Sequence, residues 1–210
     1  MGRNLDSKCK ICRRAGRKLF LKGERCYSPK CSLGRRKYPP GVHGVKGYPK
    51  LSEYGEILRE KQNMKNFYGL LEKQFKNYFK KAKKEKGDQG TIFLRFLEKR
   101  LDNVLYRAGF FISRNKARQV INHGLATVNG KVVDIPSYEV KIGDLIKLKT
   151  KESLLKAVKE AISKRYSESL PLWFNVDKEK IEIKILKMPN EEDLLKEFNV
   201  RAVVEFYSRQ

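Results

Sequence analysis

Residues 100–144 read RLDNVLYRAGFFISRNKARQVINHGLATVNGKVVDIPSYEVKIGD, and this stretch decides the expected fold class. Its first part predicts an amphipathic helix, because apolar residues recur at helical spacing. The buried stripe of this helix is formed by Leu97, Leu101, Val104, Leu105 and Ala108. The far side of the helix carries Lys99, Arg100, Asn103 and Arg107, and the other flank carries Glu98 and Asp102. We therefore expect one side to be buried and another to present cations.

A second helix is expected after Ser113, whose side chain suits the N-cap position. Its core stripe is formed by Ala117, Val120 and Ile121, and its exposed face is expected to carry Arg114, Asn115, Arg118, Gln119 and Asn122, without any acid. Gly124 fits the C-terminal cap, and Asn129-Gly130 predicts a tight hairpin turn. Two basic helices and a hairpin hold cations at fixed spacing, which suits the repeating phosphates of a nucleic acid. A merely solvated helical face is the simpler alternative.

The charge balance of the chain also favours a polyanionic partner. The sequence contains 48 Lys and Arg against 24 Asp and Glu, a formal net charge of +24. Residues 1–50 hold fifteen cations and two acids, whereas residues 151–210 hold twelve and eleven. Because such an excess causes self-repulsion in the free protein, a polyanion that neutralises it is the simplest explanation. Most of the anion binding is therefore expected before residue 151.

Other features of the sequence disfavour a membrane protein, an exported protein and an enzyme. No apolar run is long enough to cross a bilayer. Residues 1–25 contain no apolar core of a signal peptide, so a cytoplasmic location is expected. The two histidines, His43 and His123, are not accompanied by a nucleophile–base set, so no catalytic site is predicted.

The four cysteines form two close pairs, Cys9 with Cys12 and Cys26 with Cys31. Two such pairs joined by a short loop can bring four thiolates around one ion, as in a structural zinc site. Neighbouring cations are expected to favour the thiolate form, and these are Arg13, Arg14, Arg17, Lys18, Lys22 and Arg25. The segment has little apolar content, so a metal would supply the missing stability. The sequence predicts one zinc ion.

Three other uses of the cysteines remain open. Two disulfides are disfavoured in a cytoplasmic chain. A thioredoxin-like redox pair lacks the strand–helix context around Cys9-x-x-Cys12 that such a pair requires. An iron–sulfur cluster is also held by four cysteines.

Four segments are expected along the chain. Residues 1–45 form a zinc-binding basic segment, and residues 46–92 form the helical part of the main domain. Residues 93–150 form the RNA-binding module, and residues 151–210 add a helix, strands and a tail that complete the module and the main domain. Within the second of these segments, residues 51–86 carry a long amphipathic helical pattern.

Patterns in the last segment predict a helix from Lys151 and then two strands. The strands run through Trp173–Val176 and Ile181–Ile185 around a turn at Asp177-Lys178. The closing Val203–Tyr207 is expected to form another strand or a docked tail. Nearer the start of the chain, tyrosines interleaved with basic residues suit stacking on unpaired bases, and these are Tyr27, Tyr38, Tyr48 and Tyr54.

Residues 100–144 resemble the small RNA-binding module named after small-subunit ribosomal protein four. The likeness to that ribosomal protein family continues through LSEYG at 51–55, REKQ at 59–62, YGLLEKQF at 68–75 and VEFYSR at 204–209. The cysteine spacing is similar to that of the zinc-binding bacterial form of the family. The module also occurs in pseudouridine synthases, a class of tyrosine tRNA ligases and stress proteins, but this chain has no segment suited to their catalytic domains.

This resemblance implies direct binding to a multi-helix junction of small-subunit ribosomal RNA in the body of the subunit, early in assembly. It implies contact with small-subunit protein five, a functional link with protein twelve in decoding accuracy, and a monomer bound within cytoplasmic ribosomes. The expected fold is α+β. It combines a mostly helical N-terminal domain, a zinc-stapled N-terminal segment and an inserted module of two helices and a small antiparallel sheet.

Two other function classes remain alternatives. An RNA-modifying enzyme needs a polar catalytic cluster in a pocket, and a zinc-containing DNA-binding regulator needs one dedicated groove-reading helix. We predict instead a structural RNA-binding protein with the metal ligands Cys9, Cys12, Cys26 and Cys31. The candidate RNA-contacting residues are Arg3, Arg13, Arg14, Arg35, Arg36, Lys37, Tyr54, Arg59, Lys61, Arg100, Arg107, Arg114, Lys116, Arg118, Gln119, His123, Asn129 and Lys131.

Overall fold

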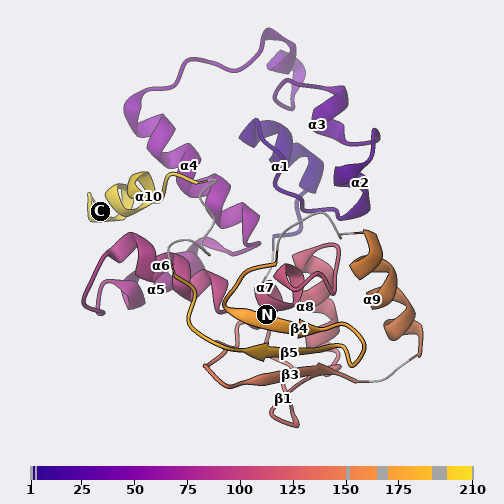
Figure 1. Ribbon diagram of the computed structural model, residues 1–210. Helices are drawn as coiled ribbons and strands as arrows, with labels where there is room; N and C mark the ends of the chain where they lie inside the picture. Colours follow the sequence, from indigo (N-terminus) through magenta and orange to yellow (C-terminus); the bar gives the residue numbers. More distant parts are fainter. Residues whose placement is uncertain (1, 3, 150–151, 165–169, 191–197, 210) are drawn as a thin grey trace. The chain divides into compact units, whose positions relative to one another are not determined.

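The computed structural model describes residues 2, 4–149, 152–164, 170–190 and 198–209. The chain forms two compact units, the first comprising Met1–Phe93 with Lys196–Gln210 and the second Leu94–Leu195. The fold is α+β, with helices in both units and a five-stranded antiparallel sheet in the second (Figure 1). None of the described helices is both long enough and apolar enough to cross a membrane.

The described part of the first unit consists of helices and loops. The helices are α1 (Lys8–Ala15), α2 (Glu24–Tyr27), α3 (Ser32–Arg35), the 3-10 helix η1 (Val42–Lys46), α4 (Glu53–Phe67), α5 (Glu72–Ala82) and α10 (Val200–Ser208). Helix α6 (Gln89–Glu98) begins in the first unit and ends in the second.

The amphipathic pattern over residues 51–86 is divided between α4 and α5, so it does not represent one long helix. The chain turns at Gly69, where φ is +67°. The Gly69 N–H donates to the Asn66 carbonyl at 3.0 Å, and the Leu70 N–H donates to the Lys65 carbonyl at 3.1 Å. These two bonds form a Schellman motif, which ends a helix with a residue in the left-handed region. The apolar pattern continues across the turn because Leu70 is also buried.

Helix α10 corrects the expectation of a strand at Val203–Tyr207, since this docked tail is helical. Asn199 caps the helix by accepting a hydrogen bond from the Ala202 N–H at 3.1 Å. The buried residues Ala202, Val203, Phe206 and Tyr207 repeat at helical rather than strand spacing. The Tyr207 ring stacks on Phe79 with 4.9 Å between ring centroids, so α10 contributes to the aromatic core of the first unit.

A polar cluster joins α4, α5 and α10 around Glu72. Lys61 Nζ donates to Glu72 Oε1 at 2.8 Å, the Tyr207 hydroxyl donates to the same oxygen at 2.7 Å, and Lys65 Nζ donates to Glu72 Oε2 at 3.1 Å. Burial raises the pKa of Glu72, but the hydrogen bonds from Lys61, Tyr207 and Lys65 outweigh it and lower the pKa to about 2. The ionised carboxylate therefore stabilises the docked position of α10.

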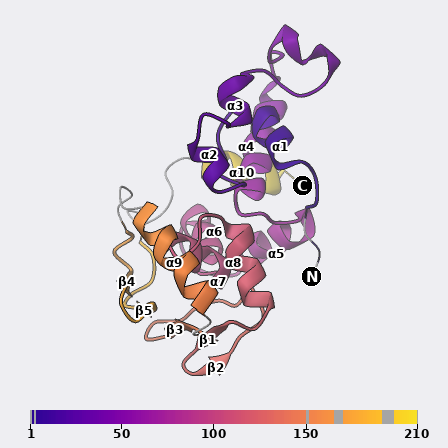
Figure 2. The same ribbon diagram turned by 90° about the vertical axis from the view of Figure 1, so that its right-hand side faces the viewer.

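The second unit places helices against one face of the sheet. Its further helices are α7 (Leu101–Arg107), α8 (Arg114–Asn122) and α9 (Glu152–Lys164). Its strands are β1 (Ala126–Val128), β2 (Lys131–Val132), β3 (Leu145–Leu148), β4 (Phe174–Asp177) and β5 (Glu182–Ile185), in the order β2-β1-β3-β5-β4 (Figure 2). The core between the helices and the sheet contains Leu105, Ile121, Val140, Trp173 and Ile183, all fully buried.

The apolar stripe from Leu97 to Ala108 spans two helices rather than one. Helix α6 ends at Glu98 and α7 begins at Leu101, and the chain around this break pairs with a later loop. The Val140 N–H donates to the Lys99 carbonyl at 2.9 Å, and the Leu101 N–H donates to the Tyr138 carbonyl at 2.9 Å. This break changes which side chains share a face, with consequences for the charged residues described below.

Several local predictions for this unit are confirmed. Ser113 caps α8, and Gly124 follows the helix with φ of +65°. Asn129 and Gly130 form the hairpin turn with φ of +50° and +78°, the positive values that a type I′ turn requires. Strands β4 and β5 pair on either side of the turn that Asp177 begins.

Candidate nucleic-acid interface

Helix α8 presents a polar face without acids to the solvent. The Ser113 hydroxyl accepts a hydrogen bond from the Lys116 N–H at 3.3 Å and fixes the start of the helix. The exposed side chains of this face are Asn115, Lys116, Gln119, Asn122 and His123. Three of the predicted RNA-contacting residues, Lys116, Gln119 and His123, are therefore accessible.

Two arginines expected on this face are buried, so their predicted exposure was wrong. Arg114 is 8% exposed, and its Nε donates to Asn103 Oδ1 at 2.8 Å. Arg118 is 7% exposed, and its NH1 lies 3.5 Å from Asp102 Oδ2. The two arginines are four positions apart and share the flank of α8 that faces α7. The sequence of α8 did not reveal this, because the partners belong to the preceding helix.

Arg100 is also buried, contrary to the prediction that it faces the solvent. Its Nε donates to Asp102 Oδ1 at 3.0 Å and its NH2 to Asp102 Oδ2 at 2.6 Å, a bidentate pair. Asp102 therefore lies between Arg100 and Arg118. Buried charges need such partners, because an unpaired ion in the protein interior is very costly.

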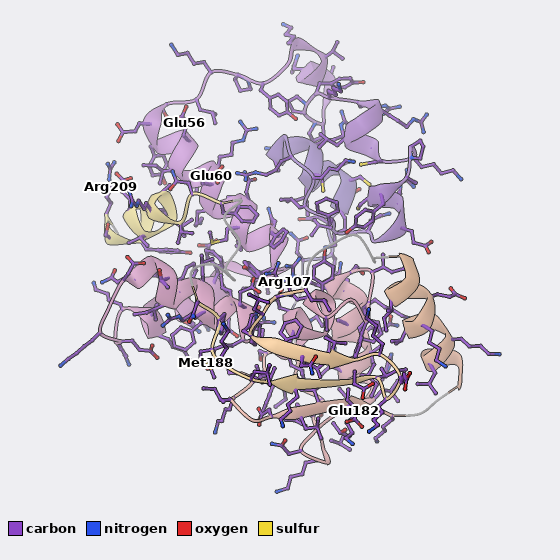
Figure 3. The ribbon with its side chains drawn as sticks, in the orientation of Figure 1. Glu56, Glu60, Arg107, Glu182, Met188 and Arg209 are labelled. Atoms are coloured by element: carbon purple, nitrogen blue, oxygen red, sulfur yellow. The ribbon has the colours of Figure 1, made fainter. Side chains whose placement is uncertain are left out.

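The break between α6 and α7 explains why the expected separation of acids and bases on this segment was wrong. Glu98 is fully buried, and its Oε2 accepts a hydrogen bond from Asn103 Nδ2 at 2.9 Å. Arg107, labelled in Figure 3, lies with its Nε 3.4 Å from the same oxygen. A continuous helix would have placed these groups on different sides, whereas the interrupted one brings them together.

The buried charges of α6, α7 and α8 retain a positive excess. Three buried arginines, Arg100, Arg114 and Arg118, and the half-buried Arg107 accompany two buried carboxylates, Glu98 and Asp102. Buried and fixed charges contribute to the potential outside the protein. These arginines therefore stabilise the helix pair and raise the positive potential around α8.

The β1–β2 hairpin places Lys131 in the solvent and uses Asn129 to fix the turn. Asn129 Nδ2 donates to Asp144 Oδ1 at 2.8 Å, and Asn129 Oδ1 accepts a hydrogen bond from the Leu145 N–H at 2.9 Å. Both polar atoms of the Asn129 side chain are therefore engaged within the protein. Of the two predicted hairpin contacts, Lys131 offers a charge to a phosphate, whereas Asn129 fixes the turn.

The predicted contacts in the N-terminal segment also divide into exposed and engaged residues. Arg14, Arg35, Arg36 and Lys37 are exposed. Arg13 is half-buried, and it donates from Nε to the Tyr38 carbonyl and from NH2 to the Pro39 carbonyl, both at 3.0 Å. Arg13 therefore attaches α1 to the following loop. Arg3 lies outside the described residues.

The three candidates on α4 have different environments. Tyr54 is 56% exposed and its ring centre lies 6.0 Å from that of Phe206, and its role in base stacking stays a prediction. Arg59 donates from NH2 to the Ala15 carbonyl at 2.9 Å, at the end of α1. Lys61 is only 4% exposed and binds Glu72, so its expected exposure was wrong. Its Nζ also lies 4.4 Å from the centre of the Phe206 ring, a cation–π contact that the sequence did not indicate.

All four cysteines are free and line one small cavity of about 20 Å³. Burial raises the pKa of the Cys12 and Cys26 thiols, although backbone N–H groups of Leu19 and Lys22 lower it in part. The expected effect of neighbouring cations is present at Cys26, where Lys18 lowers the pKa of the thiol, but burial outweighs it. Among the described residues, no group of three or more His, Cys, Asp or Glu side chains is arranged so that it could hold a metal ion as it stands.

A groove in the first unit was not predicted from the sequence. It is lined by α1, the loop that follows Tyr38, and α4. Three amide side chains on α4, Gln62, Asn63 and Asn66, line it together with Lys65. The available signal was the alternation of amides and lysines in KQNMKN at 61–66.

Family comparisons agree with this arrangement of a helical unit and a small mixed module. Residues 3–98 match the ribosomal protein S4/S9 N-terminal domain, and residues 99–146 match the S4 domain. The α7–α8 helix pair and the β1–β2 hairpin therefore form the core of an S4 domain, and the chain belongs to the class of S4-domain proteins.

Full-length relatives narrow this class. The chain is 48% identical over 209 residues to the small ribosomal subunit protein uS4 of Thermus thermophilus, covering 100% of both chains. The uS4 proteins of Thermodesulfovibrio yellowstonii and Dictyoglomus turgidum are similar to the same extent, also over 100% of both chains. The chain belongs to the uS4 family of small-subunit ribosomal proteins.

Proposed function

We propose that this chain is a structural component of the small ribosomal subunit and binds small-subunit ribosomal RNA directly. The observation that carries this proposal is the exposed, acid-free face of α8, where Lys116, Gln119 and His123 stand beside buried arginines with a positive excess. A lysine provides charge for a phosphate, and an amide and an imidazole add directional hydrogen bonds. The similarity to uS4 over the whole chain supports the same role.

The RNA target is a multi-helix junction rather than one continuous helix. Exposed cations occur in separate parts of the chain, including Arg14 and Arg35 in the first unit and Lys116 and Lys131 in the second. RNA helices that meet at a junction from several directions can contact these separate cations at the same time. Linking the sites in one chain raises affinity only for an RNA whose geometry lets them engage together. Early binding of this kind nucleates assembly of the subunit body.

A binding measurement with matched variants tests the proposal. Lys116→Ala should weaken binding to small-subunit ribosomal RNA and reduce the slope of log affinity against log salt by about 1, because one phosphate contact is lost. Lys159→Ala, which removes an exposed lysine from α9, serves as the control and should leave both values unchanged. A scrambled RNA of equal length should compete poorly at physiological salt. Equal competition by the scrambled RNA would show nonspecific charge binding and contradict the proposal.

We also propose that Cys9, Cys12, Cys26 and Cys31 hold one structural zinc ion. Their common cavity supports this, since a volume of about 20 Å³ suits a single ion-sized occupant. The Lys22 N–H lies 3.4 Å from the Cys26 sulfur and provides a backbone hydrogen bond to that ligand. Zinc binding requires the cysteine side chains to turn further into the cavity and lose their protons. The ion would join α1, α2 and the start of α3.

The resemblance to the ribosomal protein family also supports finer partner assignments. We propose contact with small-subunit protein five and a functional link with protein twelve in decoding accuracy, with this chain present as a monomer in cytoplasmic ribosomes. Crosslinking within purified small subunits, followed by identification of the joined peptides, tests the contact with protein five. Crosslinks to other proteins but not to protein five would contradict it.

A further inference from the structure

The first unit contains an open groove of about 980 Å³ that is independent of the α8 face. Its walls come from α1, the loop of residues 39–51 and α4. A groove of this size is at the upper end of the range for sites that hold small organic ligands. It is therefore large enough for a nucleotide together with the phosphates on either side of it.

Asn63 supplies an unmatched hydrogen-bond donor at the wall of the groove. Its side chain is 3% exposed, and its Nδ2 makes no hydrogen bond to the described part of the protein. Buried polar groups are nearly always hydrogen-bonded, because leaving one unmatched is costly. Because Nδ2 itself has almost no accessible surface, the Asn63 amide must rotate toward the groove before an acceptor on a ligand can satisfy it.

The other lining residues define the chemistry of that ligand. Lys10 and Arg14 are exposed on α1, and the one acid in the lining is Asp6. The balance of charge therefore favours an anion such as a phosphate. Gln62 and Asn66 add further amides beside Asn63, and amides form paired hydrogen bonds with the edges of nucleic-acid bases.

Tyr48 gives the groove a rigid aromatic wall. Its hydroxyl donates to the Arg13 carbonyl at 2.5 Å, and the guanidinium of Arg59 lies 5.1 Å from the centre of its ring. Arg59 is itself fixed by the Ala15 carbonyl at the end of α1. The hydrogen bond at its hydroxyl and the contact with Arg59 fix the Tyr48 ring, so the ring loses little conformational freedom when it stacks on a base.

We propose that this groove binds one unpaired nucleotide of small-subunit ribosomal RNA. The Asn63 amide rotates toward the groove and its Nδ2 donates a hydrogen bond to the base edge, Tyr48 contacts the base, and Lys10 and Arg14 bind the neighbouring phosphates. The inference rests on the proposed function and adds a base-reading site to it. An RNA occupant is favoured over a protein segment, because cations, several amides and an aromatic ring together match a nucleotide.

Two groove variants and a control test this site. Asn63→Leu removes the amide at similar volume, and Lys10→Glu with Arg14→Glu changes only exposed positions on α1. Lys30→Glu, an exposed charge reversal that is not in the groove lining, is a control for charge reversal elsewhere in the first unit. Binding to full-length small-subunit ribosomal RNA is measured together with chemical modification of the unpaired bases. The thermal midpoint of each variant shows whether it is folded.

The wild-type protein and the Lys30→Glu control should protect the same unpaired nucleotide from modification. Both groove variants should lose this protection, and Asn63→Leu should bind roughly tenfold more weakly, as expected for the loss of contacts to one base edge. Protection attributed to α8 should remain. If folded groove variants keep the whole protection pattern and bind the RNA as tightly as the wild-type protein, the proposal is overturned. Failure of the wild-type protein to bind the RNA at all would contradict the proposed function instead.

Discussion

Replacing Asp102 with alanine should strongly destabilise the second unit, because two buried arginines share this carboxylate. Arg100 makes two charge-assisted bonds to it at 3.0 and 2.6 Å, and Arg118 lies 3.5 Å away. Removing one partner of a buried ion pair costs about 3–5 kcal/mol, because the remaining buried charge loses a partner that offsets its desolvation. Arg100 would lose two hydrogen bonds and Arg118 its contact with the same carboxylate, so the free energy of unfolding should fall by an amount in this range.

Trp173 makes this loss measurable for one unit alone. It is the single tryptophan of the sequence, it is fully buried, and it belongs to the core of the second unit. Its fluorescence during urea unfolding therefore reports on that unit. With a urea slope of about 1–3 kcal/mol per molar, the midpoint should fall by more than about 1 M.

The control for this experiment is Asp134→Ala, which removes the same charge from an exposed position. Its effect should stay within about 0.5 kcal/mol, as is usual for surface substitutions. Equal urea midpoints for the Asp102 and Asp134 variants would refute the reasoning. The arginines would then be stabilised by other groups.

Three further substitutions should have distinct effects. Gly16→Ala should lower the free energy of unfolding by roughly 1–2 kcal/mol, because φ at Gly16 is +74° and the new Cβ would lie 2.5 Å from Arg59 NH2. Thermal unfolding followed by circular dichroism should show no such loss for the control Gly34→Ala, whose new Cβ meets nothing within 4 Å. Glu72→Gln should destabilise the protein at pH 7 but much less at pH 2. The lowered pKa of Glu72 stabilises the folded protein fully above pH 4.5, the usual pKa of the group, and this stabilisation is lost as the pH falls toward about 2. Urea midpoints that differ from wild type by the same amount at both pH values would contradict this. The native protein should contain about one zinc ion per chain, and the Cys26→Ser variant should lose this ion. Elemental analysis of the native protein that finds iron, or no metal under reducing conditions, would exclude the proposed zinc site.

The elements of the second unit could be predicted because their signals are local. Ser113 as a cap and Asn129-Gly130 as a turn each depend on a few neighbouring residues. The end of α4 was missed because buried Leu70 continues the apolar pattern beyond Gly69. Helix α10 was ambiguous because its valines favour strands, whereas its buried residues follow the helical period.

The candidate site was predicted less completely, because exposure depends on partners far apart in the chain. The exposed positions of Lys116 and Gln119 follow from helical spacing within α8 alone. The burial of Arg118 depends on Asp102, sixteen residues earlier, and on the break between α6 and α7. Asn63 was missed for the same reason, since the groove it lines also needs α1 and a loop.

The position of α10 in the chain has a consequence for folding during synthesis. The aromatic core of the first unit includes Tyr207 and Phe206, yet residues 94–195 are translated before either of them. The second unit has a continuous sequence and can fold as soon as it has emerged, since domains generally fold as units during translation. The first unit begins earlier but remains without its closing helix until the end. The order in which the two units are completed is therefore the reverse of the order in which they begin.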